Sequence, residues 1–195
     1  MDKGSYYSHP QALVESEHIG SGTQIWAFAH VLKGAIIGSQ CNIGDHCYIE
    51  NGARIGNQVV IKNGVSIWNG LTIEDFVFIG PNVSFTNDLF PRARVYHDHY
   101  ETTHIREGAS IGANATLLCG ITLGRWCLVG AGSVVTKDVP DFAIVYGIPA
   151  TIRRWVCKCG KILEFNDDKQ IRCECGLEYE KQDTRIICLS IQGRA

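Results

Sequence analysis

An aliphatic residue recurs at every sixth position of this chain, and this period constrains the fold more than any other feature. Between residues 19 and 79 the register does not slip, and the anchor residues are Ile19, Ile25, Val31, Ile37, Ile43, Ile49, Ile55, Ile61, Ile67, Ile73 and Ile79. Neither the period of about 3.6 residues of a helix nor the alternation of a simple strand produces a repeat of six. A hexad means a short extended segment and a turn, repeated, which is the pattern of a parallel β-helix. In such a solenoid each coil buries its inner face against the coils above and below it.

The residue two positions before each anchor is small or aliphatic, from Thr23 to Val83. Positions two apart in an extended segment lie on one face, so each side of a coil sends an anchor and a smaller partner inward. Three hexads then close a coil of 18 residues, and the coils stack about 4.8 Å apart. We expect Leu13 to extend the series by one step, and residues 1–12 to form an irregular lead-in.

The hexad stops after Phe85 and resumes at Ile105, from where it runs to about Val139. The gap of 20 residues equals one hexad plus 14 extra residues. Residues 86–104 are therefore predicted to leave the coil as an inserted loop, and a long loop on a regular scaffold is more often functional than decorative.

Asparagines mark the corner from which this loop departs. Asn51, Asn69 and Asn87 lie 18 residues apart, each two residues after an anchor, and are predicted to stack on one another. Asparagine side chains at corners commonly form hydrogen-bonded ladders, which is the expected role of Asn51 and Asn69. Asn87 differs because the loop follows it.

Charge and composition exclude several classes of partner. The formal net charge of −2 gives no electrostatic case for binding nucleic acid or an anionic membrane surface. The N-terminal residues contain no apolar signal core, and no apolar run is long enough to span a membrane. We expect a cytoplasmic protein whose nine cysteines are reduced thiols, one subset of them binding metal. Cys41, Cys47 and Cys127 occupy the small inward position and are expected to be core residues, whereas the sequence assigns no role to Cys119 or Cys188.

Several stretches resemble a known family over about residues 12–154. The IG-containing hexads and the closing run GAGSVVTKDVPDFAIVYGIPA (130–150) are similar to the left-handed β-helix acyltransferases. More narrowly, IWAFAHVLKGAIIG (25–38) and FTNDLFPRA (85–93) resemble the sugar-nucleotide 3-N-acetyltransferases. Members of that family acetylate a 3-amino group on UDP-2-acetamido-3-amino-2,3-dideoxyglucuronate or on dTDP-3-amino-3,6-dideoxyhexoses. The resemblance implies an all-β, left-handed parallel β-helix over residues 1–154, and a homotrimer that binds acetyl-CoA between neighbouring rods.

A site for the acyl donor is expected on the coils after the loop. Gly112-Ala113 and Gly130-Ala131 are 18 residues apart, so they should stack and leave backbone N–H and C=O groups bare for the amides of a pantetheine arm. Lys137, Arg153 and Arg154 could meet phosphates as charged donors. The alternative is that the glycine–alanine pairs only turn a corner and that the basic residues are solvated. The resemblance implies that the following residues line coenzyme A: Ala113, Ala131, Ser133, Ile148, Pro149 and Ala150.

The acceptor site is expected where the loop leaves the coil. Acetyl transfer to an amine needs a neutral nucleophile held near the thioester carbonyl, together with donors for the developing oxyanion. The amide of Asn87 fits that orienting role, and the resemblance implies the same position. A dedicated base is not essential, because the departing thiolate can accept the proton. Asp88 and Arg92 are candidate contacts for the sugar or diphosphate, with a plain surface-loop role as the alternative.

Histidines and aromatic residues offer further candidates. His30 precedes an anchor and so points outward, and with Trp26 and Phe28 it makes an exposed aromatic face. This face could pack against a neighbouring subunit, or His30 could contact substrate or act as a general base across the interface, with Trp26 binding substrate. His99 and His104 have the spacing of zinc ligands in the γ-type carbonic anhydrases, which share this rod. No third ligand is evident, so solvated loop histidines are expected.

The last segment, residues 155–195, breaks the repeat and carries the motif CxCG twice. Cys157, Cys159, Cys173 and Cys175 suit one tetrahedral zinc site with four thiolates, as in a small zinc-ribbon-like module. One residue between the cysteines of each pair is tighter than the usual two. A structural metal would explain how so short a module folds.

Together with these observations, the resemblance implies an acetyl-CoA-dependent N-acetyltransferase that modifies a nucleotide-linked 3-amino sugar in surface polysaccharide synthesis. An O-acetyltransferase acting on a sugar or a small metabolite is the alternative among enzymes. A non-catalytic trimeric scaffold is the alternative outside them, and the glycine–alanine ladder and the loop argue against it. The sequence identifies neither the nucleotide nor the sugar.

Overall fold

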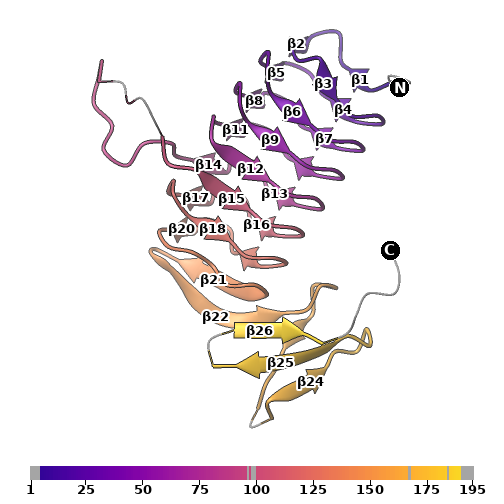
Figure 1. Ribbon diagram of the computed structural model, residues 1–195, viewed down its shortest axis with the longest axis vertical. Helices are drawn as coiled ribbons and strands as arrows, with labels where there is room; N and C mark the ends of the chain where they lie inside the picture. The colour runs from indigo at the N-terminus through magenta and orange to yellow at the C-terminus, as the bar shows by residue number, and fades with distance from the viewer. Residues whose placement is uncertain (1–4, 96, 98–99, 167, 184, 190–195) are drawn as a thin grey trace.

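Short strands stacked in parallel coils make up most of the molecule, as the computed structural model shows (Figure 1). The structure describes residues 5–95, 97, 100–166, 168–183 and 185–189. No helix occurs among these residues, and so none is long and apolar enough to cross a membrane.

Each coil has three faces, and the strands of successive coils pair within each face. The first face is a sheet of ten strands, in the order β1 (Tyr7–Ser8), β4 (Gln24–Ile25), β7 (Asn42–Ile43), β10 (Val60–Ile61), β13 (Phe78–Ile79), β16 (Ser110–Ile111), β19 (Leu128–Val129), β21 (Ala143–Gly147), β22 (Ala150–Val156) and β23 (Ile162–Leu163). The second face consists of two sheets, β2 (Leu13–Val14), β5 (His30–Val31), β8 (Tyr48–Ile49) and β11 (Ser66–Ile67), then β14 (Ser84–Phe85), β17 (Thr116–Leu117) and β20 (Val134–Val135). The third face contains β3 (His18–Ile19), β6 (Ile36–Ile37), β9 (Arg54–Ile55), β12 (Leu71–Ile73), β15 (Thr103–Ile105) and β18 (Thr122–Leu123).

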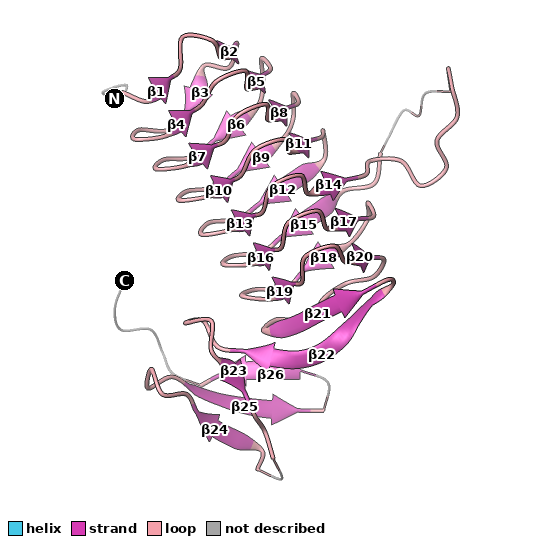
Figure 2. Ribbon diagram, turned by 180° about the vertical axis from the view of Figure 1, so that it is seen from behind, coloured by secondary structure: helices cyan, strands magenta, loops and turns pink. Residues whose placement is uncertain are grey.

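The pairing register confirms the hexad. Ile43 lies between Ile25 and Ile61, each 18 residues away, in the first sheet. Across the interruption Ile73 pairs with Ile105, an offset of 32 residues, which is one coil plus 14. The described residues that follow β14 extend away from the rod (Figures 1 and 2).

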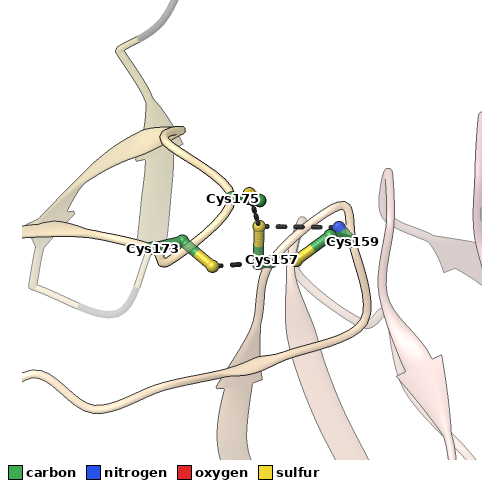
Figure 3. Close-up of side chains that lie close together, drawn as sticks. All are labelled: Cys157, Cys159, Cys173 and Cys175. Atoms are coloured by element: carbon green, nitrogen blue, oxygen red, sulfur yellow. Dashed lines mark hydrogen bonds between the residues drawn. The ribbon is translucent and has the colours of Figure 1, made fainter.

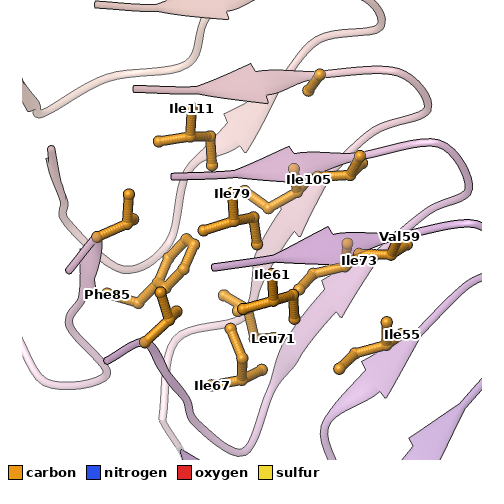
Figure 4. Packing of buried hydrophobic residues seen from close by; sticks show 14 of the residues in the cluster. Ile55, Val59, Ile61, Ile67, Leu71, Ile73, Ile79, Phe85, Ile105 and Ile111 are labelled. Atoms are coloured by element: carbon orange, nitrogen blue, oxygen red, sulfur yellow. The ribbon is translucent and has the colours of Figure 1, made fainter. Parts of the chain in front are cut away.

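The anchors fill the interior of the rod from one end to the other. Figure 4 shows anchors of neighbouring coils packed side by side, with the smaller partners such as Val59 and Leu71 between them. Cys41, Cys47 and Cys127 are buried in this core, as expected. Burial of such an uninterrupted apolar column is the main stabilising contribution to a solenoid.

The prediction for Leu13 is wrong. Leu13 is 54% exposed, and the neighbouring Val14 packs against the core and pairs with Val31. The first coil is therefore one residue shorter than the others. Ser16 fills the next small inward position and donates from its Oγ to the carbonyl oxygen of Ala35 at 2.6 Å. A terminal coil has a neighbour on one side only, which leaves its register less constrained.

The prediction of an asparagine ladder is also wrong about which residues form it. The side chains of Asn51 and Asn69 do not bond to one another in the part of the chain that the structure describes, and the Asn69 N–H donates to Glu50 Oε2 at 2.7 Å. The ladder runs instead along the corner after the third face. There Asn57 Oδ1 accepts from the Ser39 N–H at 2.9 Å. Asp75 on the next coil in turn accepts from the Asn57 N–H at 2.6 Å.

The corners contain a second repeat that follows the anchors by three residues. Here φ is positive, whether the residue is glycine, as at Gly34 (91°), or a large side chain, as at Phe28 (59°) and Trp126 (56°). The glycines directly after anchors have another function. A Cβ atom on Gly38 would lie 2.4 Å from the Gly56 carbonyl oxygen, so glycine is needed there for coils to approach.

Beyond the last coil the chain forms a hairpin and a small second sheet. Strands β21 and β22 pair antiparallel and carry the chain out of the rod, and β23 pairs with β22. Strands β24 (Gln170–Arg172), β25 (Glu178–Gln182) and β26 (Arg185–Cys188) form the separate sheet. A second apolar cluster joins this sheet to the rod and includes Phe142, Leu163, Tyr179 and Ile186.

Candidate functional site

Two glycine–alanine pairs lie at the corner after the first face, near the C-terminal end of the rod. Gly112-Ala113 follows β16 and Gly130-Ala131 follows β19, and these two strands pair 18 residues apart. A Cβ atom on Gly112 would lie 2.5 Å from the Ala131 nitrogen, so only glycine allows this approach of the coils. The prediction that the pairs stack is confirmed.

The backbone N–H groups of Ala113 and Ala131 lack the side-chain acceptor that other coils supply at this corner. At the same corner of an earlier coil, Asn63 Oδ1 accepts from the N–H of Asp45 at 3.2 Å. Alanine has no side-chain oxygen that could do the same, and neither alanine N–H has an acceptor within the described residues. Two successive coils therefore present unpaired donors, which is the arrangement expected for binding a chain of amides.

Ser133 lies next to this corner but does not face solvent. Its side chain is buried, and its Oγ accepts a hydrogen bond of 3.3 Å from the Gly147 N–H at the end of β21. Ser133 therefore holds the β21–β22 hairpin against the rod. Its carbonyl oxygen accepts from the Thr116 N–H at 2.8 Å in the preceding coil.

The tip of the hairpin projects from the rod. Ile148 is 77% exposed, and the guanidinium of Arg153 lies 5.4 Å from the centre of the Tyr146 ring. Both views show this tip on the same side of the rod as the segment after β14 (Figures 1 and 2). Of the remaining residues expected to contact coenzyme A, Ala150 is half-buried against the core, and five are exposed: Lys137, Ile148, Pro149, Arg153 and Arg154.

Asn87 is half-buried at the point where the chain leaves β14. The preceding residue, Thr86, is fixed to the next coil, because its Oγ1 accepts from the Cys119 N–H at 2.9 Å and its N–H donates to the Leu117 carbonyl at 3.0 Å. The Asn87 side-chain amide has no hydrogen-bond partner among the described residues. A free amide on a fixed backbone is what an orienting role requires.

Trp68 lies one coil before this point, where the second face divides into two sheets. Its indole Nε1 donates to the Phe85 carbonyl at 2.7 Å, and β11 and β14 belong to separate sheets. The sequence analysis missed both Trp68 and Thr86. The register of the repeat could have indicated that they lie near each other, because Trp68 is at the same corner as Thr86, one coil earlier.

The structure gives Asp88 a role inside the loop. Asp88 Oδ1 accepts from the Phe90 N–H at 2.8 Å, and Oδ2 lies 3.5 Å from His97 Nε2. Arg92 is exposed and donates to the Pro91 carbonyl at 2.8 Å. Asp88 thus shapes the turn that follows Asn87, while Arg92 remains available to a ligand.

His30 and Trp26 lie nearer the N-terminal end. His30 is on β5, three coils before β14 on the same face, which places it about 14 Å from the start of the loop. Its Nε2 lies 3.2 Å from Glu15 Oε1. Trp26 is part of the exposed surface, and its Nε1 donates to Asn42 Oδ1 at 2.8 Å. One chain alone does not bring these residues to Asn87. His104 is exposed on β15, and His99 lies outside the described residues.

The four tail cysteines converge, as Figure 3 shows. Their sulfur atoms all lie within 4.8 Å of one another, with Cys157 Sγ 3.4 Å from Cys175 Sγ and Cys159 Sγ 3.7 Å from Cys173 Sγ. A tetrahedral zinc ion with Zn–S bonds of about 2.3 Å would place the sulfurs about 3.8 Å apart. The four thiols therefore fit a metal of this size and preference.

Both cysteine pairs have the same local backbone. The N–H of Cys157 donates to the Lys161 carbonyl, and that of Cys173 to the Leu177 carbonyl, each at 2.8 Å. A hydrogen bond from the backbone of Leu177 lowers the pKa of the Cys175 thiol to about 7, while burial raises the pKa of Cys157. Two matching turns that face one another are typical of a four-thiolate metal site.

Comparison with known proteins identifies the family of this chain. The family model described as Bacterial transferase hexapeptide (six repeats) matches residues 18–51, 40–75 and 102–137. A dTDP-3-amino-3,6-dideoxy-alpha-D-galactopyranose 3-N-acetyltransferase of Aneurinibacillus thermoaerophilus is 51% identical over 177 residues, 91% of this chain and 92% of that protein. A galactoside O-acetyltransferase of Lactococcus lactis is 35% identical over 82 residues, 40% of each chain. A solved structure of AntD, an N-acyltransferase of Bacillus cereus, covers 79% of this chain and 78% of that chain at 18% identity, with a TM-score of 0.49. The chain therefore belongs to the hexapeptide-repeat acyltransferases, in the branch that contains sugar-nucleotide 3-N-acetyltransferases.

Proposed function

We propose that this protein is an acetyl-CoA-dependent N-acetyltransferase that acylates the 3-amino group of a nucleotide-linked amino sugar. The observation that carries the proposal is the placement of Asn87. Its unpartnered amide stands at the interruption of the coil, on the side of the rod that carries the hairpin tip. A relative with 51% identity over almost its whole length acts on a dTDP-linked 3-amino-3,6-dideoxyhexose, so this substrate class is the first choice, and the UDP-linked 3-amino uronate is the second.

The acyl donor would lie along the corner of Ala113 and Ala131. Their free N–H groups would bond to pantetheine carbonyls, and the exposed tip at Ile148 would cover the arm. Lys137 and the basic residues of β22, Arg153 and Arg154, would meet the phosphates. Ser133 would act through the hairpin that it holds.

The reaction needs orientation more than a strong base. The sugar amine attacks the thioester carbonyl as a neutral nucleophile, and the carbonyl oxygen gains negative charge. The Asn87 amide can donate to that oxygen or hold the amine with its own oxygen. When the C–S bond breaks, the departing thiolate takes the proton that the amine loses. Asp88 would shape the turn that follows Asn87, and Arg92 would place a positive charge on the loop side of the acceptor site.

The active form would be a homotrimer of left-handed rods with the active sites between subunits. The distance of about 14 Å between His30 and Asn87 along one rod supports this arrangement, because both could serve one site only across an interface or along an extended substrate. Exposed aromatic side chains near His30, among them Trp26 and Phe28, suit subunit packing. The protein would act in the cytoplasm, where nucleotide sugars for surface polysaccharides are made.

The tail would bind one structural zinc ion through Cys157, Cys159, Cys173 and Cys175. The sulfur spacing and the paired turns support this site. Zinc bound there would link the end of the rod to the small second sheet, and it would supply folding free energy to a segment with little core of its own.

An assay that compares dTDP- and UDP-linked 3-amino sugars with acetyl-CoA tests the proposal. We expect acetylation of at least one 3-amino substrate and none of the matching 3-hydroxy sugar. Release of CoA with hydroxyl acceptors such as galactosides, and not with amines, would favour the O-acetyltransferase. The absence of acetyl-CoA binding at millimolar concentration in isothermal titration would overturn both and leave the scaffold.

A further inference from the structure

Tyr179 occupies the junction between the two halves of the cysteine site. The first pair, Cys157 and Cys159, follows β22 of the rod sheet, and the second pair follows β24 of the separate sheet. Tyr179 lies on β25 and is fully buried, with 0% of its surface exposed. A tyrosine buried to this degree is rare unless its hydroxyl is satisfied.

Two contacts of the Tyr179 hydroxyl, among the residues that the structure describes, are with the first cysteine turn. The Lys158 N–H donates to the hydroxyl oxygen at 3.1 Å, and the same oxygen lies 3.1 Å from Cys157 Sγ. In the second contact either the hydroxyl or the Cys157 thiol could be the donor. A metal-bound Cys157 thiolate carries no proton, so with metal present the Tyr179 hydroxyl would be the donor.

The ring of Tyr179 makes the opposite contact, with the rod. It meets the Phe142 ring edge-on, with centroids 5.3 Å apart. Phe142 belongs to the last coil, and its carbonyl oxygen accepts from the Val156 N–H at 2.8 Å, one residue before Cys157. One side chain therefore touches a metal ligand, the backbone of the ligand turn and the end of the rod.

We propose that Tyr179 is a positioning residue of the metal centre, and that its ring makes the docking of the tail sheet on the rod depend on the bound metal. The inference rests on the zinc site proposed above. With metal bound, the Tyr179 hydroxyl donates to the Cys157 thiolate and fixes the ring against Phe142. Without metal, no metal–sulfur bond joins the two cysteine turns, and the contact that seats the ring weakens.

The test is the zinc affinity of Tyr179→Phe, measured by competition with a chromophoric chelator. This variant keeps the ring and removes the hydroxyl, and a lost outer hydrogen bond to a ligand typically weakens metal binding about 10- to 100-fold. Tyr7→Phe, the same change at the far end of the rod, should bind zinc as the wild type does. Phe142→Leu removes the ring contact and keeps the hydroxyl, so it should loosen the tail and weaken zinc binding less than Tyr179→Phe does.

Hydrogen exchange on the wild-type protein covers the case in which Tyr179→Phe does not fold. Removal of zinc by a chelator should speed exchange of the Lys158 amide and of β25, while the amides of the central coils stay protected. Equal zinc affinity for Tyr179→Phe and wild type, or unchanged exchange at Lys158 after chelation, would overturn the inference. Wild-type protein that neither contains nor binds zinc would overturn the metal site itself and leave the proposed acetyltransferase activity untouched.

Discussion

Replacement of Ala131 by proline removes one of the two open N–H groups at the candidate acyl-donor corner. The chain already tolerates proline at this position of the repeat, because Pro81 stands two residues after an anchor at the same corner, two coils earlier. Both positions follow a glycine, Gly80 and Gly130, so the restriction on the residue before proline is the same. Ala131 has no intramolecular acceptor in the described chain, so the substitution breaks no hydrogen bond of the fold.

The expected effect follows from the number of bonds lost. One neutral hydrogen bond to a pantetheine carbonyl contributes about 0.5–1.5 kcal/mol to binding. At about 1.4 kcal/mol for a tenfold change, Ala131→Pro should weaken acetyl-CoA binding roughly 2- to 12-fold. The double variant with Ala113→Pro should weaken it by about the product of the two single effects, unless one bond depends on the other.

Isothermal titration with acetyl-CoA and thermal unfolding together measure this effect. Ala131→Gly is the matched control, because it also changes the side chain but keeps the N–H, and it should bind within about twofold of wild type. Wild-type affinity for Ala131→Pro, at an unchanged melting temperature, would refute the reasoning that this N–H binds the donor. A lowered melting temperature for Ala131→Pro alone would instead show that the corner does not accept proline as it does at Pro81.

Three further predictions address the acceptor site, the tail and the rod. Asn87→Ala should lower kcat by about 10²- to 10³-fold with the oligomer intact in size-exclusion chromatography, as expected for one oriented donor; unchanged turnover would remove Asn87 from the mechanism. Cys175→Ser should lose stoichiometric zinc in metal analysis while Cys188→Ala retains it, and equal metal content in both would argue against the four-cysteine site. Gly38→Ala should cost about 3 kcal/mol in chemical unfolding, since its Cβ would lie 2.4 Å from a carbonyl of the next coil. Gly132→Ala, with φ of 67° and open space around it, should cost about 1–2 kcal/mol; equal losses would contradict the stacking argument.

Much of the rod could be predicted because its buried side chains recur at a fixed period in the sequence. Ile25 and the anchors after it are buried because stacking leaves no other place for an aliphatic side chain, and the spacing therefore carries the register. The corners were less predictable. Positive φ recurs three residues after the anchors, but Phe28 and Trp126 occupy such positions as well as glycines, so residue type conceals the turn. The register of the first coil could not be predicted either, since Val14 and not Leu13 continues the core.

The candidate site was predictable where it rests on the repeat. The 18-residue spacing placed Ala113 against Ala131, and it placed Asn87 at the last corner before the interruption. Contacts between side chains that are distant in sequence could not be read in this way. The bond from the Gly147 N–H to Ser133, which ties the hairpin to the rod, depends on how the last coil ends. The partners of Tyr179 depend likewise on how the tail folds back.

The interruption after Phe85 shows how a solenoid can carry a long segment outside its coils without losing stability. The coil resumes in the same register after 14 extra residues, so the apolar column stays continuous from Ile73 to Ile105. The Oγ1 of Thr86 accepts from the next coil, so the chain is fixed up to the residue before Asn87. Beyond that point added length costs little, because the entropy of closing a loop grows only with the logarithm of its length. Binding residues can therefore vary in the loop while the rod holds the amide of Asn87 in place, and substitutions beyond Asn87 should alter substrate preference before they alter the melting temperature.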